Sequence, residues 1–412
     1  MSRIRIRNFG PIKEGNIEND GWIDIKKVTL FIGNQGSGKS TVAKLISTFT
    51  WLEKALVRGD YSENDFSTKK SSFESLLNFH RLGNYYNYSH NKKISIEYEG
   101  DVYALKWDGE FLSPTQIETE KQVSFSLPQI MYVPAERNFL SYVKSPNELK
   151  LSSDSLMEFL AEYENAKEHL IEPIGLPIDD VLLEYDEITE QLYLKGKGYK
   201  IGLHEASSGY QALAPLYIVS KYLAEKSTDK IGKQDSMTVE EKKRFQQVTN
   251  DIYNNNDLTD EQKRAAVSAL ASKFNKTSFI NIVEEPEQNL YPTSQRKMLN
   301  SLLEFNNKTA ANKLIMTTHS PYIINYLSLA VQAAGLKEKI SGQQVLDRLS
   351  RIVPLDSALS ASDLIIYQLN DDGTLKTLGN YEGIPRDDNY LNESLAHGND
   401  LFDQLLEIEQ GL

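Results

Sequence analysis

Residues 31–41 read FIGNQGSGKST and directly follow the apolar run Val-Thr-Leu at 28–30. The stretch contains the phosphate-loop pattern Gly-x-x-x-x-Gly-Lys-Ser, which begins at Gly33. Apolar residues then recur at the spacing of an amphipathic helix, at positions 42, 45, 46, 49 and 52. Strand, glycine-rich loop and helix in this order predict a nucleotide-binding loop in an α/β protein.

The loop residues suit the recognition of a polyphosphate. Glycines let successive backbone N–H groups turn towards a β-phosphate. Lys39 is expected to reach the β- and γ-phosphates, and Ser40 to offer its hydroxyl to Mg²⁺. Kinases, GTPases and motors share this motif, so the class of protein must come from other residues. The loop residues expected to bind ATP are Gly33, Asn34, Gly36, Ser37, Gly38, Lys39, Ser40 and Thr41.

Two further stretches carry the side chains that hydrolysis needs. The apolar run in FINIVEEPE ends in Glu284 and Glu285, and MTTHSP places His319 after another apolar strand. A nucleotide hydrolase needs one acid to hold magnesium and a second to orient and deprotonate the attacking water. A neutral imidazole can hydrogen-bond a γ-phosphate or that water. We therefore expect Lys39, Glu285 and His319 to be catalytic, and Ser40 and Glu284 to hold Mg²⁺.

Four motifs in order resemble those of the ABC-type ATPases: the phosphate loop, ASSGYQAL at 206–213, IVEEPEQNLYP at 282–292 and TTHSP at 317–321. The pattern is similar to the branch that contains the SMC-like DNA-repair ATPases and the OLD enzymes. The resemblance implies that Ser207, Ser208 and Gly209 close on the γ-phosphate of a partner subunit's ATP. It also implies that Glu284 is the magnesium acid, Glu285 the catalytic base and His319 the switch histidine. YVPAERN, at 132–138, matches the stretch near the family's glutamine loop, with Gln129 or Glu136 in place of its glutamine.

The departures from the transporter pattern favour the SMC and OLD side. The signature reads Ser-Ser-Gly-Tyr-Gln instead of Ser-Gly-Gly-Gln, and the magnesium acid is Glu instead of Asp. A transporter subunit would also be shorter than this chain. No sustained heptads separate the two halves, which argues against a rod-armed chromosome or repair protein.

Composition narrows the chemistry further. The 412 residues include no cysteine and only six scattered histidines, which excludes disulfides, thiolate zinc sites and cysteine nucleophiles. The formal net charge of −13 disfavours a protein that coats DNA, so a DNA contact is possible only through a local patch. No stretch approaches the roughly 20 apolar residues of a membrane span. We expect a cytoplasmic protein without a membrane partner.

The expected fold is α/β: a mixed sheet flanked by helices, with an antiparallel β annex, a helical insertion and a small C-terminal α+β extension. The core is expected at 1–140 and 201–330, with the β annex at 60–120 inside it. A helical and β insertion precedes the signature at 141–200. A helical insertion covers 225–276, and the C-terminal extension covers 331–412.

OLD enzymes carry a Toprim-type nuclease after the ATPase, but only 93 residues follow His319 here, and neither NDDG at 370–373 nor YEG at 381–383 lies in the strand order that such a site requires. A nuclease effector is therefore expected to be a separate polypeptide. Stand-alone ATPases of this kind resemble the ATPase components of bacterial anti-phage systems, which pair with a Toprim effector and answer a phage-encoded trigger. The expected assembly is a homo-oligomer of ATP-sandwich dimers, such as a hexamer. The alternative is an SMC-like repair ATPase acting directly on DNA.

Overall fold

A six-stranded sheet forms the centre of the molecule. The computed structural model describes residues 2–67, 70–87, 93–118, 127–143, 153–228, 239–255, 259, 262–264, 266–267, 270 and 276–410. The strand order is β15-β14-β3-β13-β12-β7, and all neighbours are parallel except β14 and β15. The strands are β3 (Val28–Gly33), β7 (Pro128–Val133), β12 (Ser278–Glu284), β13 (Lys313–Thr317), β14 (Leu364–Leu369) and β15 (Leu375–Thr377).

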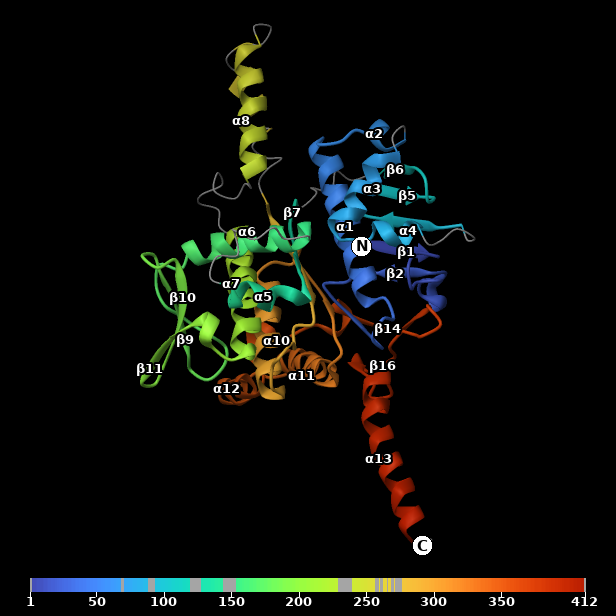
Figure 1. Cartoon of the computed structure of the whole chain (residues 1–412), viewed down its shortest axis with the longest axis vertical. Coiled ribbons are helices and arrows are strands. Elements are labelled where there is room, and N and C mark those ends of the chain that lie inside the picture. The colour runs from blue at the N-terminus through green and yellow to red at the C-terminus, as the bar shows by residue number, and fades with distance from the viewer. Residues whose placement is uncertain are drawn as a thin grey trace.

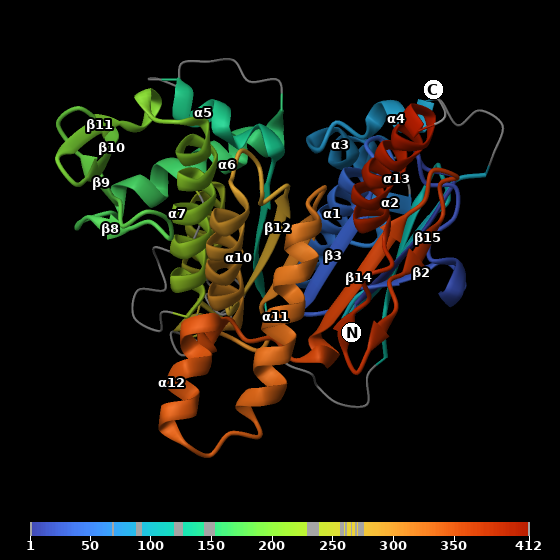
Figure 2. The same cartoon turned by 90° about the horizontal axis from the view of Figure 1, so that it is seen from below.

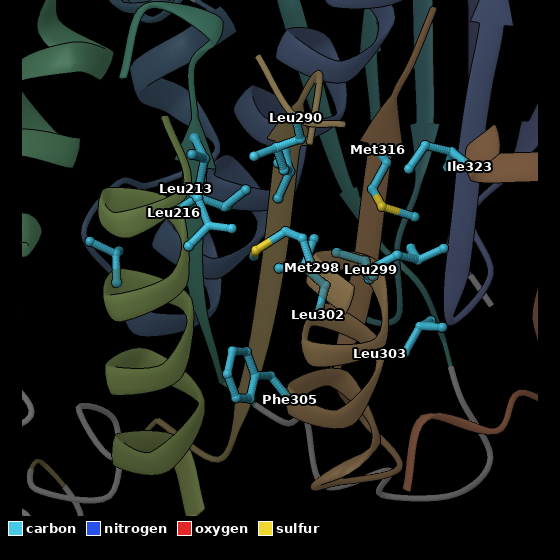
Figure 3. Packing of buried hydrophobic residues seen from close by; sticks show 14 of the residues in the cluster. Leu213, Leu216, Leu290, Met298, Leu299, Leu302, Leu303, Phe305, Met316 and Ile323 are labelled. Atoms are coloured by element: carbon cyan, nitrogen blue, oxygen red, sulfur yellow. The ribbon is translucent and has the colours of Figure 1, made fainter. Parts of the chain in front are cut away.

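Helices cover one face of this sheet, and α1 (Lys39–Arg58) together with a second sheet covers the other (Figures 1 and 2). Because side chains alternate along a strand, Leu30 and Ile32 of β3 pack on the helical side, whereas Phe31 packs towards α1 and the second sheet. Figure 3 shows the helical side, where side chains of α7 and α10 meet over β12 and β13. The helices on this side are α6 (Asp154–Glu168), α7 (Ser208–Thr228), α10 (Pro292–Asn307) and α11 (Pro321–Lys337). Both faces of the parallel strands are thus buried, which explains their nearly continuous apolar sequences.

The second sheet is the antiparallel annex, of order β2-β1-β4-β5-β6. Arginines along β1 form ion pairs inside it: Arg3 with Glu99 (2.7 Å) and Arg5 with Glu97 (2.7 Å). Residues 60–120 are not β structure throughout, because helices α2 to α4 precede these strands. The elements are β1 (Arg3–Arg7), β2 (Trp22–Asp24), β4 (Ser95–Glu99), β5 (Tyr103–Trp107), β6 (Leu112–Gln116), α1 (Lys39–Arg58), α2 (Asn64–Ser67), α3 (Lys70–Phe79) and α4 (Gly83–Asn87).

A small four-stranded sheet, β11-β10-β9-β8, lies before the signature sequence and beside α6 (Figure 2). Its strands are β8 (Ile174–Gly175), β9 (Leu182–Asp186), β10 (Gln191–Gly196) and β11 (Tyr199–Gly202). Within 225–276, α8 (Val239–Asn254) projects away from the body (Figure 1). The short helices are η1 (Ile17–Asn19), η2 (Ala135–Arg137), α5 (Asn138–Tyr142), η4 (Leu203–Glu205), η5 (Leu355–Ser357) and η6 (Ala361–Asp363).

The C-terminal segment corrects the expected boundary of the core at 330. The run DLIIYQL does pair with the strand after it, as a hairpin would, but β14 also pairs in parallel with β3, so the core sheet includes residues well beyond 330. The segment ends in α13, which extends away from the body on the side opposite α8 (Figure 1). Its other elements are α12 (Gln343–Ile352), β16 (Asn380–Tyr381), β17 (Ile384–Pro385) and α13 (Tyr390–Gln410). Among the described residues, no helix has the length and apolar character required to span a membrane.

Candidate nucleotide-binding and hydrolysis site

The phosphate loop joins the end of β3 to the start of α1. Gly33, Gly36 and Gly38 all have positive φ, at 149°, 78° and 104°. At Gly38 a Cβ would also lie 2.6 Å from Ile12 Cδ1, and at Gly33 it would lie 2.7 Å from the carbonyl oxygen of Leu369. Larger residues would therefore be strained and crowded. The backbone is shaped as an anion-binding concavity at a helix N-terminus.

Lys39 lies folded into this loop. Its side chain is 5 % exposed, and its Nζ donates to the carbonyl oxygens of Gly33 (2.9 Å) and Asn34 (2.8 Å). Burial lowers the pKa of Lys39 to about 8, although the carboxylates of Glu285, Glu287 and Glu284 act to raise it. The amine is thus held within the field of three acids, and a bound phosphate would replace its two carbonyl partners.

Glu284 is the last residue of β12 and is 5 % exposed. Its Oε2 accepts a hydrogen bond from the backbone N–H of Ala135 (3.2 Å), while its Oε1 is buried with no hydrogen-bond partner. A buried carboxylate oxygen is costly in this state unless a cation or donor meets it. The exposed hydroxyl of Ser40, in the first turn of α1, offers a second hard oxygen ligand.

These donors fit Mg²⁺, which prefers oxygen ligands and usually keeps several waters and phosphate oxygens in its shell. No group of three or more His, Cys, Asp or Glu side chains within the described part of the chain could hold a metal by itself. The donor set therefore suits an ion that arrives with a nucleotide.

Glu285 follows the strand and turns the chain sharply. Its φ is +45°, and its N–H donates to the carbonyl oxygen of Thr317 (3.0 Å) at the end of β13. Its side chain is 36 % exposed, with Oε1 3.7 Å from Nε2 of His319. Burial and the charge of Lys39 lower the pKa of His319, against the opposing effect of Glu285. His319 is accordingly neutral at pH 7, so it can hydrogen-bond a phosphate or a water without carrying a charge.

Glu287 is a third carboxylate that the sequence analysis missed. Its Oε1 accepts a hydrogen bond from the backbone N–H of His319 (2.8 Å), and its Oε2 is buried without a partner. Burial raises the pKa of Glu287. The residue was visible as the last acid of the Glu-Glu-Pro-Glu run, but only the fold shows that it holds the histidine-bearing turn.

Arg137 was also missed. Its guanidinium donates to the carbonyl oxygens of Glu284 (2.7 Å) and Glu285 (2.6 Å), and so fixes the backbone that carries both acids. The two positions left open for the glutamine loop lie in the same part of the chain but differ in burial. Gln129 is buried near the start of β7, whereas Glu136 is exposed beyond its carboxyl end, at the edge where the phosphate loop lies. Position alone thus favours Glu136.

The signature residues lie elsewhere on the same edge of the sheet. Ser207 and Ser208 are exposed at the start of α7, and a Cβ on Gly209 would lie 3.0 Å from the carbonyl oxygen of Asn289, in the turn after Glu285. Strand β13 separates β3, which leads into the phosphate loop, from β12. Lys39, Glu284, Glu285 and His319 thus gather at one place, and the signature lies beyond β12.

One family model and several solved structures are similar to this chain. A family model described as AAA ATPase domain matches residues 260–324, which include Glu284, Glu285 and His319. The SMC head domain from Thermotoga maritima is 10% identical, covers 92% of this chain and 98% of its own, and has a TM-score of 0.34.

Two other solved structures show similar values. A Smc head domain with an extended coiled coil, bound to the C-terminal domain of ScpA and derived from Pyrococcus furiosus, is 9% identical, covers 98% of this chain and 100% of its own, and has a TM-score of 0.38. An ATP-binding cassette described as a dimer in a post-hydrolysis state, bound to ADP and Pi, is 12% identical, covers 92% and 100%, and has a TM-score of 0.30. No curated protein matches the sequence. At these TM-scores, the class of the protein follows from its own sheet and site.

The parallel sheet, the loop between β3 and α1 and the acids at the end of β12 define a P-loop ATPase with an ABC-type core. The matched ATPase domain spans the acidic part of this site. The chain is an ATP-hydrolysing enzyme.

We expect ATP binding to take up a proton at alkaline pH. Because the pKa of Lys39 is about 8 without nucleotide, the amine is largely neutral at about pH 9, and a bound triphosphate favours its charged form. Proton uptake should approach one per site at about pH 9, where the terminal phosphate is fully ionised. Calorimetric titration in buffers of different ionisation enthalpy measures it. An uptake near zero at that pH would contradict the lowered pKa.

We expect Glu287→Ala to destabilise the protein by about 0.5–1.5 kcal/mol, the net contribution of an ordinary hydrogen bond, because it removes the acceptor of the His319 N–H. Glu287→Gln keeps an acceptor oxygen and removes repulsion with Glu285, so it should be at least as stable as wild type. Urea unfolding of the three proteins checks this order. Equal midpoints for the alanine and glutamine variants would show that the hydrogen bond contributes nothing.

Proposed function

We propose that the protein is an ATP-dependent sensor and scaffold of a bacterial anti-phage defence system. In this proposal ATP holds two copies together, and the assembly retains a separate Toprim-type nuclease effector until a phage-encoded trigger changes the arrangement. The motifs in the sequence resemble most closely those of AriA of the PARIS system, with PtuA of Septu as the next candidate.

Within the site, we assign each side chain a role from its position. Lys39 neutralises the β- and γ-phosphates, and Glu284 with Ser40 holds the Mg²⁺ that accompanies ATP and offsets the charge of its phosphates. Glu285, more exposed than Glu284, orients the attacking water and accepts its proton. His319 stays neutral and hydrogen-bonds the γ-phosphate or the water.

The observation that carries the assembly is the position of the signature. Ser207, Ser208 and Gly209 lie at the same edge as the phosphate loop, but on the far side of β12. The exposed N-terminus of α7 can act on an anion presented from outside the chain. A second copy, facing this edge and rotated by half a turn, would present its phosphate loop to this signature and its signature to this loop.

The exposed apolar side chains of α13 support a protein partner. Leu395, Phe402 and Leu405 are exposed on this projecting helix, a feature that marks interaction sites more often than free surface. The alternative, direct action on DNA, finds less support, because Arg3 and Arg5 of β1 are paired with acids of the same sheet.

The test is co-expression of the native operon with a tagged chain, comparing wild type, Lys39→Ala, Glu285→Gln and the exposed-lysine control Lys197→Ala. Light scattering gives the mass, and mass spectrometry identifies what co-purifies. We expect wild type, Lys197→Ala and Glu285→Gln to retain a nuclease-like protein and Lys39→Ala to lose it. A dimer that retains no protein, and whose ATPase rises with added DNA, would overturn the scaffold and favour the repair-type machine.

A further inference from the structure

Arg137 is a charged side chain in an unusual position. It is 1 % exposed, and its hydrogen-bond partners are four backbone carbonyl oxygens. Burial lowers its pKa only to about 10, with the nearby carboxylates acting in the opposite direction, so the side chain remains charged at pH 7. A buried cation is retained at high cost unless its hydrogen bonds are fully made, and here each one goes to a different residue.

Three of the four carbonyl groups belong to two functional regions, and the fourth belongs to the segment of Arg137 itself. Glu284 and Glu285 carry the acids that serve the ATP of their own chain, and Pro134 precedes the short helix η2 that contains Arg137. The remaining partner, Ala212, lies one turn after the signature in α7, and its oxygen accepts from Nε of Arg137 at 3.2 Å. One guanidinium therefore joins the hydrolytic turn to the helix that presents the signature.

A proline inside α7 leaves a helix carbonyl free to bond near the site of this contact. Pro215 lies inside the helix and has no N–H, so the carbonyl of Gln211, four residues earlier, loses its usual partner. The buried hydroxyl of Ser141, in α5, donates to that oxygen at 2.9 Å. Arg137 takes the adjacent carbonyl, that of Ala212. The segment after β7 thus docks on the first turns of α7 where the proline opens the helix.

We propose that Arg137 is a positioning residue that couples the two ATP sites of the dimer. The inference rests on the proposed ATP-sandwich assembly, in which the acids of one chain serve its own ATP and its signature serves the ATP of the other. A change at the Glu284–Glu285 turn moves the guanidinium, and the guanidinium moves the start of α7. Hydrolysis in one site is then sensed in the other, which makes turnover cooperative in ATP.

The test compares Arg137→Met, Arg137→Lys, Pro215→Ala and the exposed control Arg348→Met for ATP affinity, kcat and the Hill coefficient of turnover. We expect wild type and Arg348→Met to be cooperative. Arg137→Met should lower kcat about tenfold and bring the Hill coefficient to about one, with ATP affinity changed less than about threefold. Arg137→Lys, a point charge without the fork, should keep the fold but not restore cooperativity.

Pro215→Ala keeps the inference testable if Arg137→Met does not fold. It returns an N–H to the carbonyl of Gln211 and strengthens the helix, so its melting temperature should equal or exceed that of wild type. We expect its Hill coefficient to fall nonetheless. A wild type that dimerises but turns over without cooperativity, or a Pro215→Ala variant as cooperative as wild type, would overturn the coupling. A Glu285→Gln variant that stays monomeric with ATP would instead contradict the proposed ATP-sandwich dimer.

Discussion

Glu285→Gln is expected to lower kcat by about 10²–10⁴-fold, the usual contribution of a positioned general base. Glutamine keeps the shape of the side chain but cannot accept the proton of the attacking water. ATP affinity should stay within a few-fold of wild type, because Lys39 and Glu284 are untouched. Steady-state turnover and binding of a fluorescent ATP analogue measure the two effects separately. Light scattering should then show a dimer that persists with ATP and dissociates slowly.

The matched control is Glu338→Gln, which removes an exposed carboxylate at the end of α11. A Glu285→Gln variant that retains more than about a tenth of wild-type kcat would assign the base to another group, since removal of a general base costs at least about 10²-fold. A large loss in Glu136→Gln together with a small loss in Glu285→Gln would point to Glu136 as that group.

Lys39→Ala is expected to weaken ATP binding by about 100-fold or more, since hydrogen bonds to charged groups contribute about 1.5–3 kcal/mol each and Lys39 serves two phosphates. Turnover and ATP-induced association should be lost with it. Without nucleotide the variant should unfold at a higher temperature than wild type. The pKa of Lys39 is lower in the folded than in the unfolded protein, so at pH 7 the burial of the charged amine destabilises the folded state. Replacing Lys39 by alanine removes this cost. The gain in stability fades as the pH rises from about 8 towards the pKa of the unfolded protein.

Isothermal calorimetry and thermal unfolding check the two parts of this prediction. Lys197→Ala, in the exposed turn after β10, is the control for loss of a positive charge. Retention of wild-type affinity in Lys39→Ala would remove the phosphate-binding role of the loop. A lower melting temperature than wild type would show that the two carbonyl hydrogen bonds of Lys39 outweigh the cost of its burial.

The sequence was sufficient to predict the α/β class and the strand, loop and helix that contain the phosphate-loop motif, and it singled out Glu284, Glu285 and His319, which the structure brings together. Each signal is local, because an apolar strand followed by a polar side chain places that side chain at the carboxyl edge of a parallel sheet. The assignment of roles to these residues remains a prediction. The two expected cofactors also differ in their support. The use of ATP follows from the class of protein, whereas the binding of Mg²⁺ is a prediction based on the fit of Glu284 and Ser40.

The missed features depend on contacts between distant segments. The apolar sequence at 364–369 is compatible with either an isolated hairpin or a core strand, because no local sequence pattern indicates pairing with β3. Arg137 resembles any surface arginine until two other segments bring their carbonyl groups to it. Glu287 would have been treated as a solvated acid for the same reason.

The pairing of β3 with β14 also affects the order in which parts of the protein fold during synthesis. The phosphate-loop strand leaves the ribosome long before its two partners, β13 and β14. Until residue 369 has been made, β3 is an apolar strand that lacks its final pairing, and its unpaired edges can associate with other chains. Such long-range parallel pairing is intrinsically slow. The nucleotide pocket therefore reaches its final form only after both of these distant strands have been made, although its own loop is translated long before them.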